Sequence, residues 1–167
     1  RNVTGVQTCA LPISAQRFVS EGARVIGIGR RADRLDSIRR DLGDAFLPLQ
    51  FDVRDHKAIP DAIADLPPDF AAITVLVNNA GLALGLQAAH QTEMDDWLTM
   101  IDTNIKGLVA MTRAVLPGMV ERKRGHVINM GSVAANHPYP GGNVYGGTKA
   151  FVHQFSLNLR ADLLDKN

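Results

Sequence analysis

The sequence of 167 residues contains one cysteine, Cys9, and only 5% aromatic residues. A single cysteine excludes an internal disulfide framework and a cysteine-rich metal site. The five histidines show no H-E-x-x-H or comparable spacing, so we expect no metal site.

An excess of charge of one sign and a long apolar run are missing as well. Lys and Arg number 18 against 17 Asp and Glu, which gives a formal net charge of +1. Without a basic excess we expect no binding of nucleic acid or of a membrane surface. The best apolar stretch, 71–77, is interrupted by Thr74, whereas about 18 apolar residues are needed to cross a bilayer. With 46% hydrophobic residues, the composition is that of a globular domain. Together these observations predict a cytoplasmic protein.

Short β-branched runs alternate along the chain with stretches that carry apolar residues at helical spacing, such as Leu35, Ile38 and Leu42. The predicted strands lie at 23–29, 45–53, 73–78 and 125–130. Strands that alternate with helices predict βαβ units. The predicted fold class is therefore α/β, a doubly wound parallel sheet of Rossmann type with helices on both faces.

Tyr145 and Lys149 form Y-x-x-x-K at the start of the last predicted helix. The i, i+4 spacing puts both side chains on one helical face. A lysine ammonium beside a phenol stabilises the phenolate, which lets a tyrosine exchange a proton with a carbonyl or alcohol oxygen. Taken alone, however, this pair is typical of an ordinary solvated helix face.

Three further motifs accompany this pair. Asn78–Gly81 (NNAG) ends a predicted strand, Asn104 lies in the helix that follows, and Ser132 lies thirteen residues before Tyr145. In this order and spacing, the motifs resemble those of the classical short-chain dehydrogenase/reductase family. The resemblance extends from about Ser14 to the end of the chain.

The resemblance implies a catalytic role for four residues. Tyr145 would be the general acid and base, and Lys149 would activate it and hold the nicotinamide ribose. Ser132 would orient the substrate oxygen and stabilise charge that develops on it. Asn104 would support a water molecule that links Lys149 to solvent.

The resemblance also implies contacts to a dinucleotide. Asn79, Ala80 and Gly81 would approach the adenosine ribose and pyrophosphate closely, which small residues permit. Asp52 and Val53 would bracket the adenine.

The residues after the strand at 23–29 bear on the choice of cofactor. NAD binding calls for an acidic residue there, to bond the free 2′-hydroxyl. This sequence instead has Arg30 and Arg31, with Asp33 inside the next helix. Two guanidinium groups suit a 2′-phosphate, so we predict NADP. The alternative is that one arginine merely caps a surface loop.

Stretches 78–85, 100–122 and 139–160 resemble the branch of the family that oxidises 3-hydroxy acids with NADP, such as serine and L-allo-threonine. The resemblance implies hydride transfer from the hydroxyl-bearing carbon to NADP, a small-molecule substrate, and a homotetramer for the intact protein. Two other functions remain open. One is an NADP-dependent carbonyl or 3-ketoacyl reductase, and the other is a nucleotide-binding member without turnover.

The first 13 residues depart from the family pattern. Family members open with a strand and T-G-x-x-x-G-x-G, whose amides meet the pyrophosphate at a helix N-terminus. In that register Gly5 would contact the cofactor, but Cys9 and Leu11 replace the later glycines and Pro12 stands where the helix should continue. We expect the first strand to be almost entirely missing. We also expect residues 1–13 to be a non-native leader that resembles translated sequencing adapter, the alternative being a divergent cofactor loop.

Residues 14–167 would then form part of a nucleotide-binding domain, truncated at both ends. Because a central strand would be missing and sheet edges exposed, we expect such a chain to fold poorly in isolation. The chain would then be an inactive fragment of a working enzyme.

Overall fold

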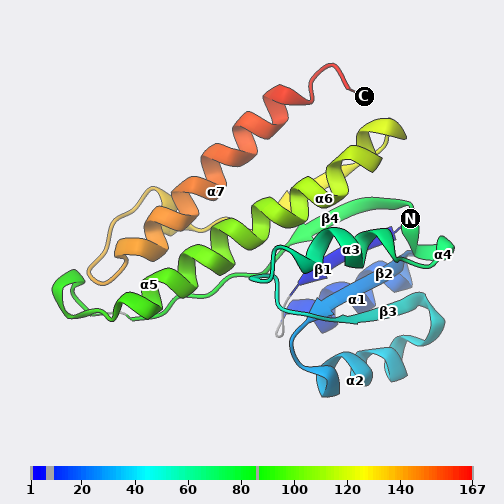
Figure 1. Cartoon of the computed structure of the whole chain (residues 1–167), viewed down its shortest axis with the longest axis horizontal. Helices are drawn as coiled ribbons and strands as arrows, with labels where there is room; N and C mark the ends of the chain where they lie inside the picture. Colours follow the sequence, from blue (N-terminus) through cyan, green and yellow to red (C-terminus); the bar gives the residue numbers. More distant parts are fainter. Residues whose placement is uncertain (1, 7–9, 86, 167) are drawn as a thin grey trace.

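The computed structural model describes residues 2–6, 10–85 and 87–166, which form one five-stranded sheet covered by helices (Figure 1). Its strands are β1 (Asn2–Val6), β2 (Arg24–Gly29), β3 (Phe46–Gln50), β4 (Ile73–Asn78) and β5 (His126–Asn129). Their order is β3-β2-β1-β4-β5, and all neighbours run parallel. The predicted doubly wound α/β fold is confirmed, and the carboxyl ends of all strands meet at one edge.

Strand β1 lies at the centre of the sheet, between β2 and β4. Gly5 stands opposite Gly27 on one side and Val77 on the other. The prediction that the first strand is almost entirely missing is therefore wrong. Five residues are an ordinary strand length, and this one is rich in β-branched residues. Its place is set by pairing with β2 and β4, which its local sequence does not show.

The helices are α1 (Ala10–Ser20), α2 (Ala32–Leu42), α3 (Ala58–Ala64), α4 (Pro68–Ala71), α5 (Met94–Ile101), α6 (Leu108–Glu121) and α7 (Asn143–Asp162). Pro12 is the third residue of α1. Proline is tolerated in a first turn because the amides there have no partner within the helix, so the expected interruption does not occur. None of the helices in the described part of the chain is long and apolar enough to span a membrane.

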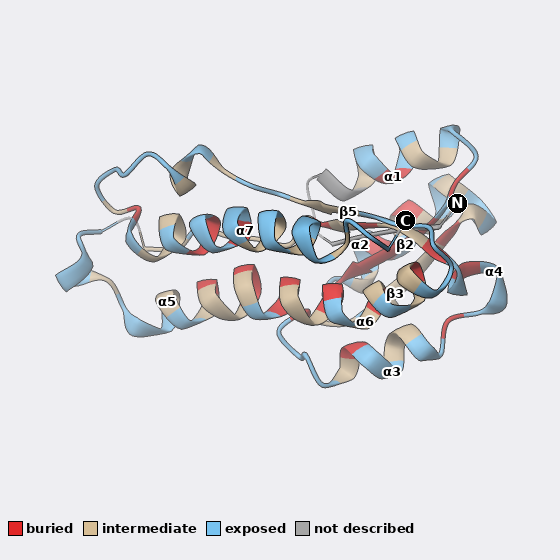
Figure 2. Ribbon diagram, turned by 90° about the horizontal axis from the view of Figure 1, so that it is seen from above, coloured by how far each residue is buried: buried red, intermediate tan, exposed pale blue. Residues whose placement is uncertain are grey.

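Alternation along the strands divides the core between the two faces of the sheet. Val25 packs with Phe46 and with residues of α1 and α2 on one face. Ile26 and Ile28 pack on the other face with residues of α3, α4 and α6. Figure 2 shows the buried residues concentrated in the sheet and on the inner sides of these helices.

Helices α5 and α6 join through a π-helical turn, Asp102–Gly107, into one long rod (Figure 1). Helix α7 packs against α5 and this turn, and also against the short 3-10 turn Val133–Ala135 that follows β5. This packing brings the N-terminal half of α7 to the carboxyl edge of the sheet. π-Helical turns interrupt helices mainly at functional sites, which draws attention to the residues of this one.

Candidate active site

Lys149 lies at the centre of the candidate site. Its side chain extends from α7 and donates a hydrogen bond of 2.8 Å from Nζ to the carbonyl oxygen of Met130, just beyond β5. The residue is only 6% exposed, and this burial lowers the pKa of the Lys149 ammonium. Nζ also lies 5.9 Å from the centre of the Tyr145 ring, so the two side chains share one face of α7.

Asn104, in the π-helical turn, is 1% exposed. Its Nδ2 donates to the carbonyl oxygen of Leu82 at 2.9 Å and to Oγ1 of Thr148 at 3.0 Å, and its Oδ1 accepts from the amide of Leu82 at 2.9 Å. Both amide hydrogens of this side chain are used within the protein. The side chain therefore ties the loop after β4 to α7.

Thr148 is a site residue that the motif analysis missed. It is 1% exposed, and its hydroxyl donates to the carbonyl oxygen of Tyr145 at 2.8 Å while accepting from Asn104. The one available signal was its position between the two motif residues of Y-x-x-x-K. The hydroxyl thus connects the backbone of Tyr145 with the π-helical turn.

The backbone of Gly81 lies against Lys149 and Asn104. A Cβ added to Gly81 would lie 3.4 Å from Nζ of Lys149 and 3.5 Å from Oδ1 of Asn104. The absence of a side chain leaves this space free, next to a buried ammonium. Ala80 packs partly against the core, and the amide of Asn79 donates to the carbonyl oxygen of Val77 at 3.0 Å.

Ser132 begins the segment that follows β5. Its Oγ accepts a hydrogen bond of 3.2 Å from the amide of Ala134, and the residue is half-buried. This segment lies close against α7, because a Cβ on Gly146 would be 3.0 Å from the carbonyl oxygen of Ala134. Ser132 is thereby held near the turn of α7 that carries Tyr145.

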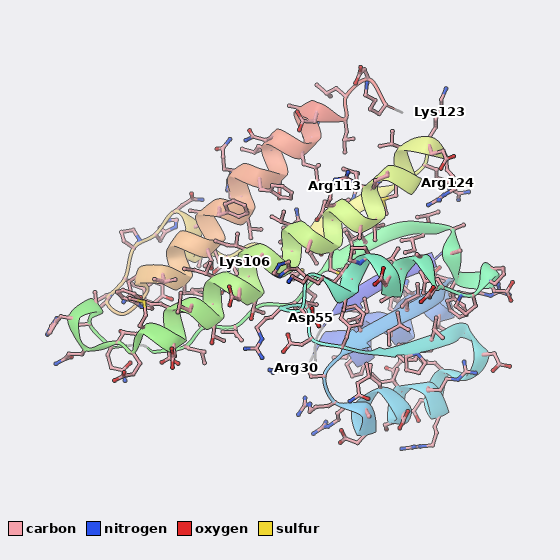
Figure 3. The ribbon with its side chains drawn as sticks, in the orientation of Figure 1. Arg30, Asp55, Lys106, Arg113, Lys123 and Arg124 are labelled. Atoms are coloured by element: carbon pink, nitrogen blue, oxygen red, sulfur yellow. The ribbon has the colours of Figure 1, made fainter. Side chains whose placement is uncertain are left out.

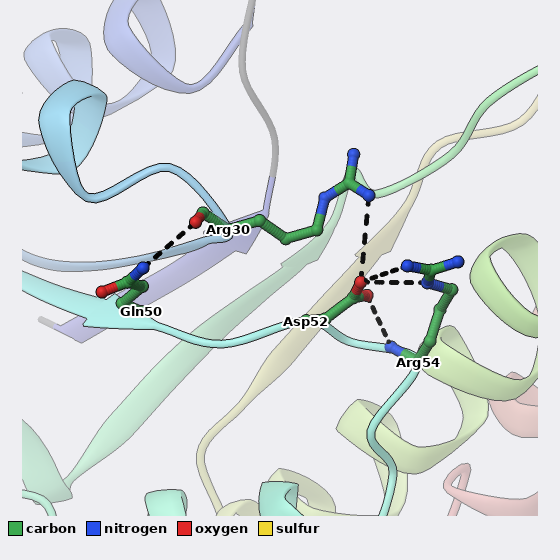
Figure 4. Close-up of polar contacts among 4 residues, drawn as sticks. All are labelled: Arg30, Gln50, Asp52 and Arg54. Atoms are coloured by element: carbon green, nitrogen blue, oxygen red, sulfur yellow. Dashed lines mark hydrogen bonds and ion pairs between the residues drawn. The ribbon is translucent and has the colours of Figure 1, made fainter.

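Beyond β2 and β3, Arg30 and Arg54 converge on Asp52 (Figure 4). Nη1 of Arg30 lies 3.8 Å from Oδ2 of Asp52, and Nη2 of Arg54 lies 2.7 Å from the same oxygen. Burial alone would raise the pKa of Asp52, but hydrogen bonds from Arg54 and the charges of both arginines lower it. Sequence analysis predicted Arg30 and Asp52 as cofactor residues and missed Arg54.

Two further predicted cofactor residues, Arg31 and Val53, directly follow Arg30 and Asp52 in the chain. Arg31 precedes α2 as its N-cap and lines a separate cavity of about 120 Å³. Val53 is 5% exposed and packs in the core, and its predicted contact with the adenine stays a prediction. Gly5 is part of β1, and Cys9 lies outside the described residues.

The basic run after α6 lies far from this corner. Figure 3 shows Arg30 and Asp55 near the carboxyl edge of the sheet, whereas Lys123 and Arg124 lie at the far end of α6. The arginines that face Asp52 are therefore distinct from the basic run after α6.

Comparison with known proteins places this geometry in a family. The family model for the short chain dehydrogenase matches residues 3–167. An NADP-dependent 3-hydroxy acid dehydrogenase of Salmonella typhi is 59% identical over 161 residues, which are 96% of this chain and 65% of the relative. A serine 3-dehydrogenase of Rhizobium radiobacter is 55% identical over 164 residues, 98% of this chain and 66% of the relative. The chain thus spans about 65% of the length of these curated relatives.

Solved structures agree with this assignment. The crystal structure of serine dehydrogenase from Escherichia coli has a TM-score of 0.93 and 54% identity, covering 98% of this chain and 76% of that one. The closed form of a serine dehydrogenase complexed with NADP+ has a TM-score of 0.92 and 54% identity, covering 98% of this chain and 66% of that one. The resemblance that the sequence motifs carry is therefore confirmed, and the chain belongs to the short-chain dehydrogenase family.

Proposed function

We propose that the protein transfers a hydride between NADP and the hydroxyl-bearing carbon of a 3-hydroxy acid such as serine or L-allo-threonine. One observation carries the catalytic part: the buried ammonium of Lys149 lies beside the Tyr145 ring and near the backbone of Gly81. The names of the relatives support the substrate class and the cofactor.

The residues present fit a phosphorylated dinucleotide. Small residues form the loop after β4, so a nucleotide can approach the backbone where a Cβ on Gly81 would otherwise stand. Arg30 follows β2, which is separated from β4 in the sheet by β1 alone. Its side chain is 59% exposed, and its guanidinium suits a 2′-phosphate. Lys149 would hold the ribose, and Arg30 would hold the phosphate.

The chain's own groups account for the proton transfer. Bound NADP would supply the acceptor for the hydride that leaves the substrate carbon. Tyr145, as the phenolate, removes the hydroxyl proton, and the electron pair of the O–H bond forms the carbonyl. The Lys149 ammonium stabilises that phenolate, and the Ser132 hydroxyl stabilises charge on the substrate oxygen.

A substrate panel tests this function. The intact, full-length protein is mixed with NADP and with serine, L-allo-threonine or 3-hydroxyisobutyrate, and the formation of NADPH is followed by absorbance. A parallel assay offers NADPH with 3-ketoacyl thioesters. We expect oxidation of a 3-hydroxy acid and its loss in Tyr145→Phe. Turnover of the thioesters alone would favour a ketoacyl reductase, and NADP binding without any turnover would favour a nucleotide-binding member.

We also propose a cytosolic homotetramer for the intact protein. Leu98 on α5 is 48% exposed and Leu157 on α7 is 51% exposed, so both helices present apolar residues to the outside. Such residues are suited to packing against further copies of the chain. Light scattering coupled to size-exclusion chromatography gives the mass directly, and a monomer or dimer at high protein concentration would contradict this assembly.

A further inference from the structure

The corner beyond β2 and β3 holds one carboxylate between two arginines (Figure 4). Arg54 binds that carboxylate in three ways: its backbone amide donates to Oδ1 of Asp52 at 3.0 Å, and its Nε and Nη2 donate to Oδ2 at 2.9 and 2.7 Å. Asp52 and Arg54 lie two positions apart in the chain, so these hydrogen bonds form within one turn. Both oxygens of Asp52 are thus engaged by Arg54.

Arg30 forms a longer ion pair with the same carboxylate but no hydrogen bond to it. Its Nη1 lies 3.8 Å from Oδ2 of Asp52, which is beyond hydrogen-bond distance, and its side chain is 59% exposed. Its backbone is fixed instead, because Nε2 of Gln50 donates to the carbonyl oxygen of Arg30 at 3.2 Å. The guanidinium of Arg30 makes no hydrogen bond to any residue that the structure describes.

The negative charge of Asp52 lies close to the proposed phosphate site, and Arg54 neutralises it. Left unbonded, Asp52 would draw the guanidinium of Arg30 toward itself and would repel an incoming phosphate dianion. We propose that Arg54 sets the preference for a 2′-phosphorylated nucleotide by holding and neutralising Asp52, which leaves Arg30 free for the phosphate. This inference rests on the proposed use of NADP. It makes Arg54 a positioning residue that does not itself contact the cofactor.

Titration calorimetry of the 167-residue chain with NADP and with NAD tests the inference. Arg54→Gln is expected to raise the Kd for NADP about fivefold, in line with the modest strength of partly exposed charge pairs, and to leave the Kd for NAD within about twofold. The Kd for NAD serves as an internal check that the variant folds. Equal weakening of both nucleotides, or no change in either, would overturn the inference.

A double variant separates neutralisation from direct contact. If Arg54 acts by holding Asp52, then Arg54→Gln weakens NADP binding in the wild type but causes no further weakening in an Asp52→Asn background, where the repelling carboxylate is gone. If Arg54→Gln weakens NADP binding equally in both backgrounds, Arg54 touches the phosphate itself and the proposed role is wrong. Arg17→Gln is the matched control, because Arg17 pairs with Glu21 at 2.7 Å on the exposed side of α1.

Measurements on the wild-type chain distinguish a failure of the proposed cofactor from a failure of the proposed role of Arg54. A wild type that binds NADP no more tightly than NAD contradicts the proposed cofactor, and the inference about Arg54 fails with it. A wild type that prefers NADP, together with an Arg54→Gln variant that keeps the full preference, contradicts only the role of Arg54.

Discussion

The side-chain amide of Asn104 donates a hydrogen bond of 3.0 Å to the hydroxyl of Thr148, and this bond joins the π-helical turn to the helix that carries the Y-x-x-x-K motif. The same hydroxyl donates to the carbonyl oxygen of Tyr145, and the same amide holds the backbone of Leu82. Two loops and two helices therefore converge on one buried pair of side chains. A displacement of Asn104 or Thr148 would therefore also move Lys149 and the loop at Gly81.

Thr148→Val removes the hydroxyl but keeps the shape of the side chain. A buried amide hydrogen of Asn104 then lacks its acceptor, which we expect to lower the free energy of unfolding by about 1–3 kcal/mol. Thr148→Ser keeps the hydroxyl and should retain most of that stability. Urea denaturation of both variants measures the difference. Equal stability of the valine and serine variants would show that the bond contributes nothing.

Gly81→Ala probes the close contact between the backbone of Gly81 and Lys149. The new methyl group would meet Nζ of Lys149 at 3.4 Å, an ordinary contact distance, so we expect the stability to change by less than about 0.5 kcal/mol. It would nevertheless fill the space assigned to the cofactor, and the Kd for NADP should rise about tenfold. Calorimetric titration measures this change. Gly147→Ala, whose Cβ would meet nothing within 4 Å, is the control and should bind as the wild type does.

Local patterns were sufficient to predict β2, β3, β4 and β5, because each is a short apolar run bounded by polar or glycine residues. The motif residues on α7 and in the π-helical turn could also be placed in advance, because their spacing is that of a known family. The prediction that residues 1–13 are a non-native leader stays a prediction. Part of that segment forms β1, and the family model matches from residue 3.

Residues whose roles depend on contacts across the fold could not be found in this way. Thr148 and Arg54 belong to no motif, and their partners are fixed only when the turns close around Asn104 and Asp52. The predicted use of both Arg30 and Arg31 at one phosphate stays a prediction. Arg31 has an extended backbone, and successive residues in extended chain point to opposite sides, so neighbours in sequence separate in space.

The buried ammonium of Lys149 predicts a pH-dependent stability. Burial lowers its pKa below the ordinary value of 10.5, so the folded protein loses this proton at a lower pH than the unfolded chain does. Between the two pKa values the unfolded state binds more protons, and the free energy of unfolding therefore rises with pH. The gain in the free energy of unfolding is fully present above pH 10.5 and is lost as the pH falls through the lowered pKa of Lys149.

Lys149→Met removes that dependence. Relative to the variant, the wild type should become more stable as the pH rises from neutral toward 10.5, as measured by urea denaturation at a series of pH values. Lys106→Met, at a side chain that is 59% exposed, controls for the loss of a positive charge as such. A wild-type advantage that does not vary with pH would mean that the burial of Lys149 has no energetic consequence.

The sheet itself contains a position where only glycine fits. The ring of Phe46, on β3 and wholly buried, covers Gly27 on β2, and a Cβ on Gly27 would overlap this ring. Because the interior is closely packed, the ring cannot move aside freely, and Gly27→Ala should lower the free energy of unfolding by about 1–3 kcal/mol.

A double-mutant cycle identifies the cause of that loss. Phe46→Leu shortens the covering side chain, so the alanine at position 27 should cost less in its presence, with a coupling of at least about 1 kcal/mol. Gly29→Ala is the matched control on the same strand, because its Cβ would lie 3.8 Å from Leu35 in ordinary contact. If Gly27→Ala and Gly29→Ala destabilise equally, with or without Phe46, the loss comes from the glycine backbone and not from the ring.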